Sequence, residues 1–181
     1  MSQYGNDSTV LAVAALLTLA PLVSTAQAQG QAGSADRVGA TSNFVTKAAV
    51  GGIAEVRLGQ LAILKASNGE VKSFGQQMAD DHGKANTELT DLAKMKGMTL
   101  PTDIDAKHQA TYDRLSKLSG AEFDRAYMQA MVADHSEDVE EFRREAKSGS
   151  DPDLKAWAAK VLPTLEHHLQ MAESTNAKVK D

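Results

Sequence analysis

The segment Met78-Ala79-Asp80-Asp81-His82 has a near copy later in the chain, Met131-Val132-Ala133-Asp134-His135. Each copy places a Met and a His four residues apart, and side chains at that spacing lie one above the other on an α-helix. Each copy therefore predicts a helix whose apolar face carries a His with an Asp beside it. The repetition predicts two similar helices within one helical domain.

The amino-acid composition also favours helices. Aromatic residues make up only 4% of the 181 residues, and the good helix formers Ala, Leu, Lys, Glu and Met dominate the rest. The length allows one domain with a single sizeable core. We therefore expect an all-α fold.

Charge and cysteine content exclude several classes of protein. The formal net charge is −5, which argues against nucleic-acid binding, because such proteins need a basic face to neutralise phosphates. The absence of Cys excludes disulfides, thiolate metal sites and thiol nucleophiles. The common catalytic motifs, among them the Gly-x-Ser-x-Gly elbow, the phosphate loop and His-Glu-x-x-His, are also absent. A non-enzyme is therefore the favoured interpretation, and only His and carboxylate chemistry remains.

The N-terminal region predicts export. An apolar run over residues 10–23 precedes Ala26-Gln27-Ala28, a small-x-small pattern typical of signal-peptide cleavage sites. The run is shorter than the roughly 20 residues of a membrane-spanning helix, so no transmembrane helix is expected in the mature chain. We predict a signal peptide over residues 1–28, although its start lacks Lys and Arg, then a flexible linker over 29–40 and one domain over 41–181.

Hydrophobic periodicity and turn residues predict four long helices, over residues 42–66, 70–96, 121–147 and 152–178. The connection between the second and third helices contains a short helix with an Asp cap, from Asp103 to Leu118. A connection of about twenty residues can cross the domain and start the next helix at its far end. The expected architecture is therefore a four-helix bundle with a long crossover that contains a short extra helix.

The first predicted helix is apolar nearly all round, because a second set of apolar side chains lies outside its main stripe: Val45, Val50, Ile53, Val56, Leu61 and Ile63. A helix of this kind is either central or packs against a partner. A homodimer, or an envelope partner bound through this helix, is therefore a further prediction. Gly51 and Gly52 each cost helix propensity of about 1 kcal/mol, which predicts that another helix comes close there.

Each long helix carries one side chain of metal-ligand type near mid-length, on the stripe that faces the interior: Glu55, His82, His135 and His168. The two members of each sequential helix pair lie at similar separations from the turn that joins them, so a rise of about 1.5 Å per residue brings all four to a similar depth. Asp81, Asp134 and Asp138 are expected to be hydrogen-bond partners of these ligands or alternative ligands.

Two interpretations of this set stay open. In the first, the buried polar side chains satisfy one another and fix the helix register. In the second, a metal ion held by one carboxylate and up to three imidazoles compensates for their burial. Zinc, iron, manganese or copper suits such a site. Met78 and Met131, each one turn before a His, would favour copper, although a Met on a core stripe more often packs.

Four segments together resemble a known family. They are Glu55-Val-Arg-Leu-Gly59, Met78-x-x-Asp-His82, Tyr127-Met-x-x-Met-Val-x-Asp-His135 and Leu162-Pro-x-Leu-x-x-His-Leu169, and in order and spacing they resemble the bacterial ferritin-like family called domain of unknown function 4142. The resemblance covers about Asp36 to Ala177. It implies a ferritin-like four-helix bundle, exported to the periplasm or the outer membrane, with no established activity.

The sequence departs from the di-iron pattern of ferritin-like proteins, which place a Glu three residues before a His on two helices. Ala79, Val132 and Leu165 stand three residues before the three candidate His ligands. Ferroxidase chemistry is therefore not carried over. The sequence predicts an exported ferritin-like bundle that binds a metal ion through its Glu and His cluster. The alternative is a non-catalytic structural or interaction protein of the cell envelope with a metal-free polar core.

Overall fold

A computed structural model of the chain describes residues 26–180, with side chains from Gly39 onward. Five helices follow one another along it, and the described residues form no strand: α1 Ala26–Lys65, α2 Gly69–Met95, α3 Ala106–Ser116, α4 Gly120–Ser148 and α5 Pro152–Val179. The all-α prediction is therefore confirmed. The predicted signal peptide falls outside the described residues except for its last three positions.

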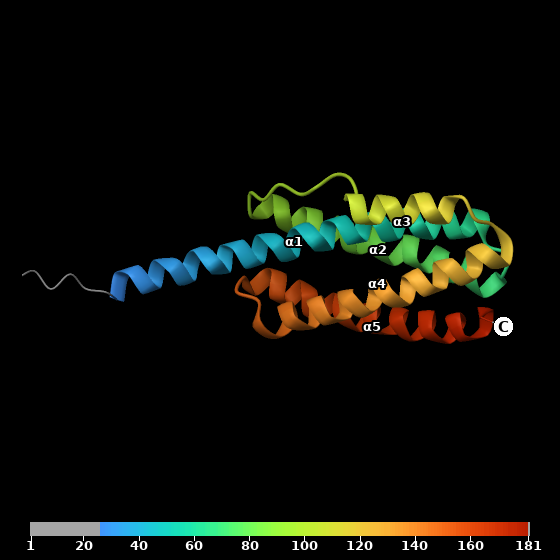
Figure 1. Cartoon of the computed structure of the whole chain (residues 1–181). Coiled ribbons are helices and arrows are strands. Elements are labelled where there is room, and N and C mark those ends of the chain that lie inside the picture. The colour runs from blue at the N-terminus through green and yellow to red at the C-terminus, as the bar shows by residue number, and fades with distance from the viewer. Residues whose placement is uncertain (1–25, 181) are drawn as a thin grey trace, which may run out of the picture.

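The four long helices lie side by side as two antiparallel pairs (Figure 1). The first pair is α1 with α2 and the second is α4 with α5, and smaller contacts of α2 with α5 and of α1 with α4 join the pairs. The short helix α3 lies in the crossover between α2 and α4, as predicted, and packs against α1 and α4. This arrangement brings the middle of α2, α4 and α5 and the C-terminal half of α1 to the same interior region.

Local capping groups explain where α2 and α5 begin. The Asn68 side chain accepts hydrogen bonds from the backbone N–H groups of Glu70 and Val71 at the start of α2. Asp151 accepts from two backbone N–H groups at the start of α5, where Pro152 occupies the first turn. These side chains satisfy N–H groups that have no partner within the helix.

The start of α1 differs from the prediction. The helix begins at Ala26 and runs through residues 29–40, for which the composition predicted a flexible linker. The segment mixes Gly and Ser with Ala, Gln and Arg, and the latter three favour helix. A helix already stabilised by packing further along can propagate into such a segment, because extension avoids the cost of a new nucleus.

The apolar core consists of two clusters with a polar layer between them. One cluster lies near the turn between α1 and α2 and includes Leu58, Phe74 and Tyr127. The other lies towards the opposite end and includes Phe142 and Trp157. On every long helix, the candidate ligand falls between the segment in one cluster and the segment in the other: Glu55 on α1, His82 on α2, His135 on α4 and His168 on α5. The polar side chains therefore share one level of the interior.

The crossover between α2 and α4, which contains α3, packs on α1. It covers part of the apolar surface of α1 for which the sequence predicted a partner. Val45, Val50 and Leu61 are buried, and the other three apolar residues outside the main stripe are half-buried. Leu115 of α3 is fully buried and joins the same apolar cluster as Leu61. Of the large hydrophobic residues whose side chains are described, only Leu64 and Met95 are exposed. The homodimer or envelope partner stays a prediction.

The closest approach of the α1 and α2 backbones is at Gly59 and Gly75, and the predicted Gly52 faces a side chain of α2. A Cβ atom on Gly75 would lie 2.8 Å from the backbone oxygen of Gly59. A Cβ on Gly51 would meet nothing within 4 Å, and one on Gly52 would meet the side chain of Asn86 and no backbone. The prediction is confirmed at Gly52, where a Cβ would overlap the side chain of Asn86 on α2, and is wrong at Gly51.

Substituting Gly75 by alanine is expected to destabilise the fold by about 1–3 kcal/mol, because the added methyl group has no space between the two backbones. Gly83→Ala is the matched control on the same helix, since a Cβ there meets nothing within 4 Å. This control is expected to stabilise the protein by about 0.5–1 kcal/mol through helix propensity. Chemical denaturation of the metal-free proteins measures both, and equal effects of the two substitutions would contradict the close approach.

Candidate metal centre

Three imidazole rings from three different helices converge in the polar layer. His82 of α2, His135 of α4 and His168 of α5 are all buried. Their ring centroids form a nearly equilateral triangle with sides of 5.6, 5.4 and 5.5 Å. One potential ligand atom from each ring lies within 4.8 Å of those of the other two. The three-His cluster, as we call it, is thus the group that the structure brings together from the predicted set.

The hydrogen bonds of two rings set the direction of their free nitrogens. Nδ1 of His135 lies 3.1 Å from the carbonyl oxygen of Met131, and Nε2 of His168 lies 3.2 Å from the carboxylate of Asp81. An imidazole that donates through one nitrogen presents a lone pair on the other, the arrangement found around protein-bound metals. Buried nitrogens without a hydrogen-bond partner among the described residues remain on all three rings: His82 Nε2, His135 Nε2 and His168 Nδ1.

Burial keeps these rings neutral. Desolvation, followed by the proximity of the other two rings, lowers the pKa of His82 well below its ordinary value. Desolvation and the neighbouring His168 lower the pKa of His135 to about 4. Desolvation also lowers the pKa of His168, although Asp81 opposes the shift. Neutral imidazole is the form that binds a metal ion, so the site needs little deprotonation at neutral pH.

The spacing of the free nitrogens suits a metal ion after a small closure of the rings. A tetrahedral zinc ion with Zn–N distances of about 2.0–2.1 Å holds its nitrogen ligands roughly 3.4 Å apart. One nitrogen from each ring lies within 4.8 Å of those of the other two, so closing these nitrogens around an ion requires each ring to move inward by about 1 Å or less. Small rotations of the three side chains supply such a movement without a change of backbone.

Glu55 is buried completely but lies outside the three-His cluster. Its nearest contact with a ring joins Oε1 to Nδ1 of His135 over 4.0 Å, and Nδ1 is the nitrogen already directed at the Met131 carbonyl. Burial raises the pKa of Glu55 well above its ordinary value, and the charge and hydrogen bond of Asp134 add to the rise. A protonated Glu55 can donate to Asp134, whereas two carboxylates would face each other without a donor.

The three predicted Asp residues have different surroundings. Asp81 hydrogen-bonds the ring of His168 and also pairs with Lys84. Asp134 lies beside Glu55 and 3.9 Å from Nε2 of His108, which belongs to α3. Burial and the charge of Asp134 raise the pKa of Asp138 to about 8. Asp134 and Asp138 therefore form an acidic group with Glu55, and only Asp81 contacts the three-His cluster.

One buried carboxylate was missed by the sequence reasoning. Asp124 is only 3% exposed and accepts hydrogen bonds from the backbone N–H groups of Ser67 and Asn68 and from the Ser67 hydroxyl. It therefore ties the first turn of α4 to the turn between α1 and α2. Its position next to the apolar Phe123 was the only sequence signal that Asp124 is buried. Its hydrogen-bond partners, Ser67 and Asn68, lie more than fifty residues away in sequence.

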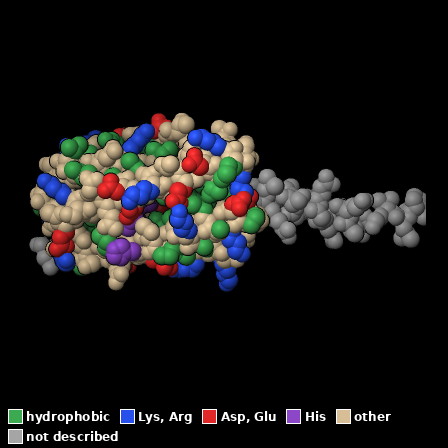
Figure 2. Space-filling model, turned by 180° about the vertical axis from the view of Figure 1, so that it is seen from behind, with side chains coloured by type: hydrophobic (Ala, Val, Ile, Leu, Met, Phe, Trp, Pro, Cys, Tyr) green, Lys and Arg blue, Asp and Glu red, His purple; other side chains and the backbone are tan. Residues whose placement is uncertain are grey.

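The outer surface offers little sign of a large charged ligand. On the face shown in Figure 2, Lys and Arg side chains are scattered among Asp and Glu side chains and uncharged residues, and neither sign of charge dominates. Many of these charges pair, for example Lys107 with Glu137 and Arg143 with Glu166. None of the helices in the described part of the chain is long and apolar enough to cross a membrane.

Comparisons with known proteins identify relatives in sequence and in fold. The family model named Domain of unknown function (DUF4142) matches residues 24–175, and no curated protein matches. Two crystal structures of DUF305 proteins are similar in fold. One is a Streptomyces coelicolor protein described as a candidate secreted protein, with 14% identity, a TM-score of 0.66, and coverage of 78% of this chain and 94% of that one. The other is a Deinococcus radiodurans fragment with 14% identity, a TM-score of 0.68, and coverage of 77% and 96%.

Proposed function

The chain belongs to the family Domain of unknown function (DUF4142), and we propose that it is a metal-binding protein whose ligands are His82, His135 and His168. One observation carries the proposal: three helices bring together three buried rings, each with a nitrogen that lacks a hydrogen-bond partner among the described residues, and one potential ligand atom from each ring lies within 4.8 Å of those of the other two. A donor or acceptor left unpaired in the interior costs about 1–3 kcal/mol. A single divalent ion gives all three nitrogens a partner at once.

The rival function is a structural or interaction protein with a metal-free polar core. A core of that kind would pair its polar groups with one another. Glu55 and Asp134 fit this description in part, because one proton between them pairs one oxygen of each and leaves the second oxygen of Glu55 without a partner. The three-His cluster fits it less well, because the N–H groups of His135 and His168 are already directed at Met131 and Asp81. Only His82 is left to donate to another ring, so at least one of the unpartnered nitrogens stays without a donor. The observation that separates the two functions is therefore confined to the three rings.

The ligand set narrows the choice of metal. Three neutral imidazoles suit zinc, copper or iron, whereas manganese prefers oxygen ligands. Met78 and Met131 are buried in an apolar cluster, which supports packing as their role and removes the argument for copper. The Glu-x-x-His pairs of di-iron proteins are missing. Zinc is accordingly the probe of choice, and no redox activity is proposed.

We also propose that the protein is an exported, ferritin-like bundle that acts in the periplasm or at the outer membrane. The apolar run over residues 10–23 and the small residues after it support export. The Streptomyces coelicolor protein of similar fold is described as a candidate secreted protein. The two antiparallel helix pairs joined by a crossover support the ferritin-like description.

Zinc titration of the metal-free protein tests the proposed function. We expect one ion per chain and a higher melting temperature, because a ligand that binds only the folded state stabilises it. Glu55→Gln is expected to keep both, since Glu55 lies outside the three-His cluster. Loss of zinc in this variant would make Glu55 a ligand. No binding and an unchanged melting temperature in the wild-type protein would favour the structural rival.

Asp81→Asn is expected to weaken zinc affinity by about 10–100-fold, because the carboxylate that orients the His168 ring and raises its basicity is lost. Competition with a chromophoric chelator measures the change. Asp80→Asn is the matched control, since Asp80 is exposed and accepts its hydrogen bond from Gln76. Equal affinities of the two variants would show that Asp81 does not support a metal ligand.

A further inference from the structure

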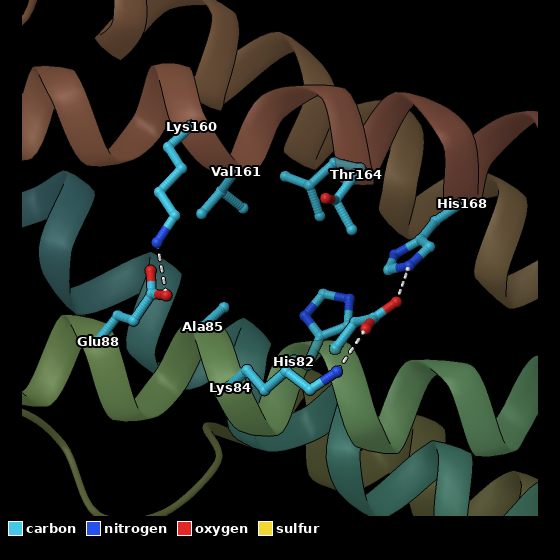
Figure 3. Close-up of a pocket in the computed structure, with 10 residues that line it drawn as sticks. His82, Lys84, Ala85, Glu88, Lys160, Val161, Thr164 and His168 are labelled. Carbon is cyan, nitrogen blue, oxygen red and sulfur yellow. Dashed lines mark hydrogen bonds and ion pairs between the residues drawn. The ribbon is translucent and has the colours of Figure 1, made fainter.

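A pocket with a volume of about 140 Å³ lies between α2 and α5 and ends at two rings of the three-His cluster. Figure 3 shows His82 and His168 at one end of this pocket and the pair Lys160 and Glu88 at the other. Lys84 and Lys160 are largely exposed, so the pocket opens at the surface beside them. The pocket therefore leads from the surface to two of the three candidate ligand side chains.

The position of this pocket distinguishes two sides of the three-His cluster. His82 and His168 line the pocket, whereas His135 and Glu55 do not. Of these four side chains His82 is the most exposed, at 6%, whereas His135, His168 and Glu55 are fully buried. Zinc sites with three protein ligands commonly leave a fourth position to water or another small ligand. On an ion held by the three rings, the side that faces the pocket is the one open to such a ligand.

Charge favours an anion in the pocket. At its mouth Lys84 pairs with Asp81 over 3.4 Å and Lys160 pairs with Glu88 over 2.6 Å, so these four charges cancel. Three neutral imidazoles leave the charge of a divalent ion unchanged. Its field acts along a pocket with apolar walls formed by Ala85, Val161 and Leu165, where low polarity strengthens electrostatic attraction.

The volume of the pocket suits a small anion. A cavity of about 150 Å³ in another protein accommodates benzene, with six non-hydrogen atoms. We propose that the pocket between α2 and α5 is a binding site for a small anion, of no more than about six non-hydrogen atoms, that completes the coordination of the metal ion. This inference rests on the proposed function.

Azide binding to the cobalt-loaded protein tests the inference. Cobalt(II) takes the place of zinc, and its visible absorption reports a change of ligand. We expect a saturable spectral change with azide in the wild-type protein. Val161→Phe fills the pocket and is expected to bind one cobalt ion but to weaken azide affinity by more than about tenfold. Val179→Phe is the control, because Val179 is a half-buried valine on the same helix that does not line the pocket.

The outcomes separate the inference from the proposed function. Cobalt binding without any response to azide, or equal azide affinity in Val161→Phe and Val179→Phe, would overturn the anion site and leave the metal centre intact. Absence of cobalt binding to the wild-type protein would overturn both. Ala85→Leu fills the pocket from α2 and is expected to reproduce the loss of azide affinity if Val161→Phe does not fold.

Discussion

Replacing His168 by alanine is expected to abolish stoichiometric zinc binding, with a loss of affinity greater than about 100-fold. Removal of a hydrogen-bond partner of a ligand already costs about 10–100-fold, and removal of the ligand itself costs more. The same result is expected for His82→Ala and His135→Ala, because the three rings contribute equally to one triangle. Metal analysis after dialysis against a weak chelator measures the loss.

His167→Ala is the matched control for this experiment. His167 precedes His168 on α5, and it is exposed whereas His168 is buried. The control is expected to retain one zinc ion per chain with wild-type affinity. The three-His cluster would be excluded as the zinc site if His168→Ala retained the ion, or if His167→Ala lost it equally.

The metal-free protein is expected to lose a His135 contribution to stability as the pH falls from about 6.5 to about 4. The folded pKa of His135 is about 4 and the ordinary value is 6.5, so the unfolded chain binds a proton in this range and the folded chain does not. The contribution is complete above pH 6.5 and is lost as the pH approaches 4. Its size is about 3 kcal/mol. Urea denaturation at several pH values measures the free energy of unfolding.

Buried carboxyl groups act in the opposite direction and need a control. Because the pKa values of Glu55 and Asp138 are raised in the folded state, their contribution to the free energy of unfolding is present at low pH, where both groups are protonated. It is lost as the pH rises, through about 8 for Asp138. The carboxyl groups are the same in the wild type and in His135→Gln, so their effect drops out of the difference between the two pH profiles. The variant is expected to lose less stability on acidification than the wild-type protein. His167→Gln is expected to behave as the wild type. Identical pH profiles for wild type and His135→Gln would contradict a neutral, buried His135.

Local signals explain why most helices were predictable. The predicted helix over 70–96 corresponds to Gly69–Met95, and that over 152–178 corresponds to Pro152–Val179. Their ends depend on residues adjacent in sequence: Asn68 and Asp151 accept hydrogen bonds from nearby backbone N–H groups, and Gly97 has a φ of 65°. The start of α1 was not predicted, because the Gly and Ser of residues 29–40 favoured a linker over a continuous helix.

The site was predictable in part because helical periodicity gives the direction of a side chain. His82, His135 and His168 lie on apolar stripes at the same level, and the structure brings them together. The position of Glu55 outside the three-His cluster was not predictable. It depends on the orientation of the His135 ring, whose Nδ1 is directed at the Met131 carbonyl. The hydrogen bonds of Asp124 and the contact between Gly59 and Gly75 join segments distant in sequence, and no local pattern encodes them.

X-ray absorption spectroscopy of the zinc-loaded protein tests the central claim most directly, because it counts the imidazole ligands of the bound ion. We predict three imidazole nitrogens at about 2.0–2.1 Å and one further light atom. A zinc ion with fewer than three imidazole ligands would contradict the convergence of His82, His135 and His168 on one metal.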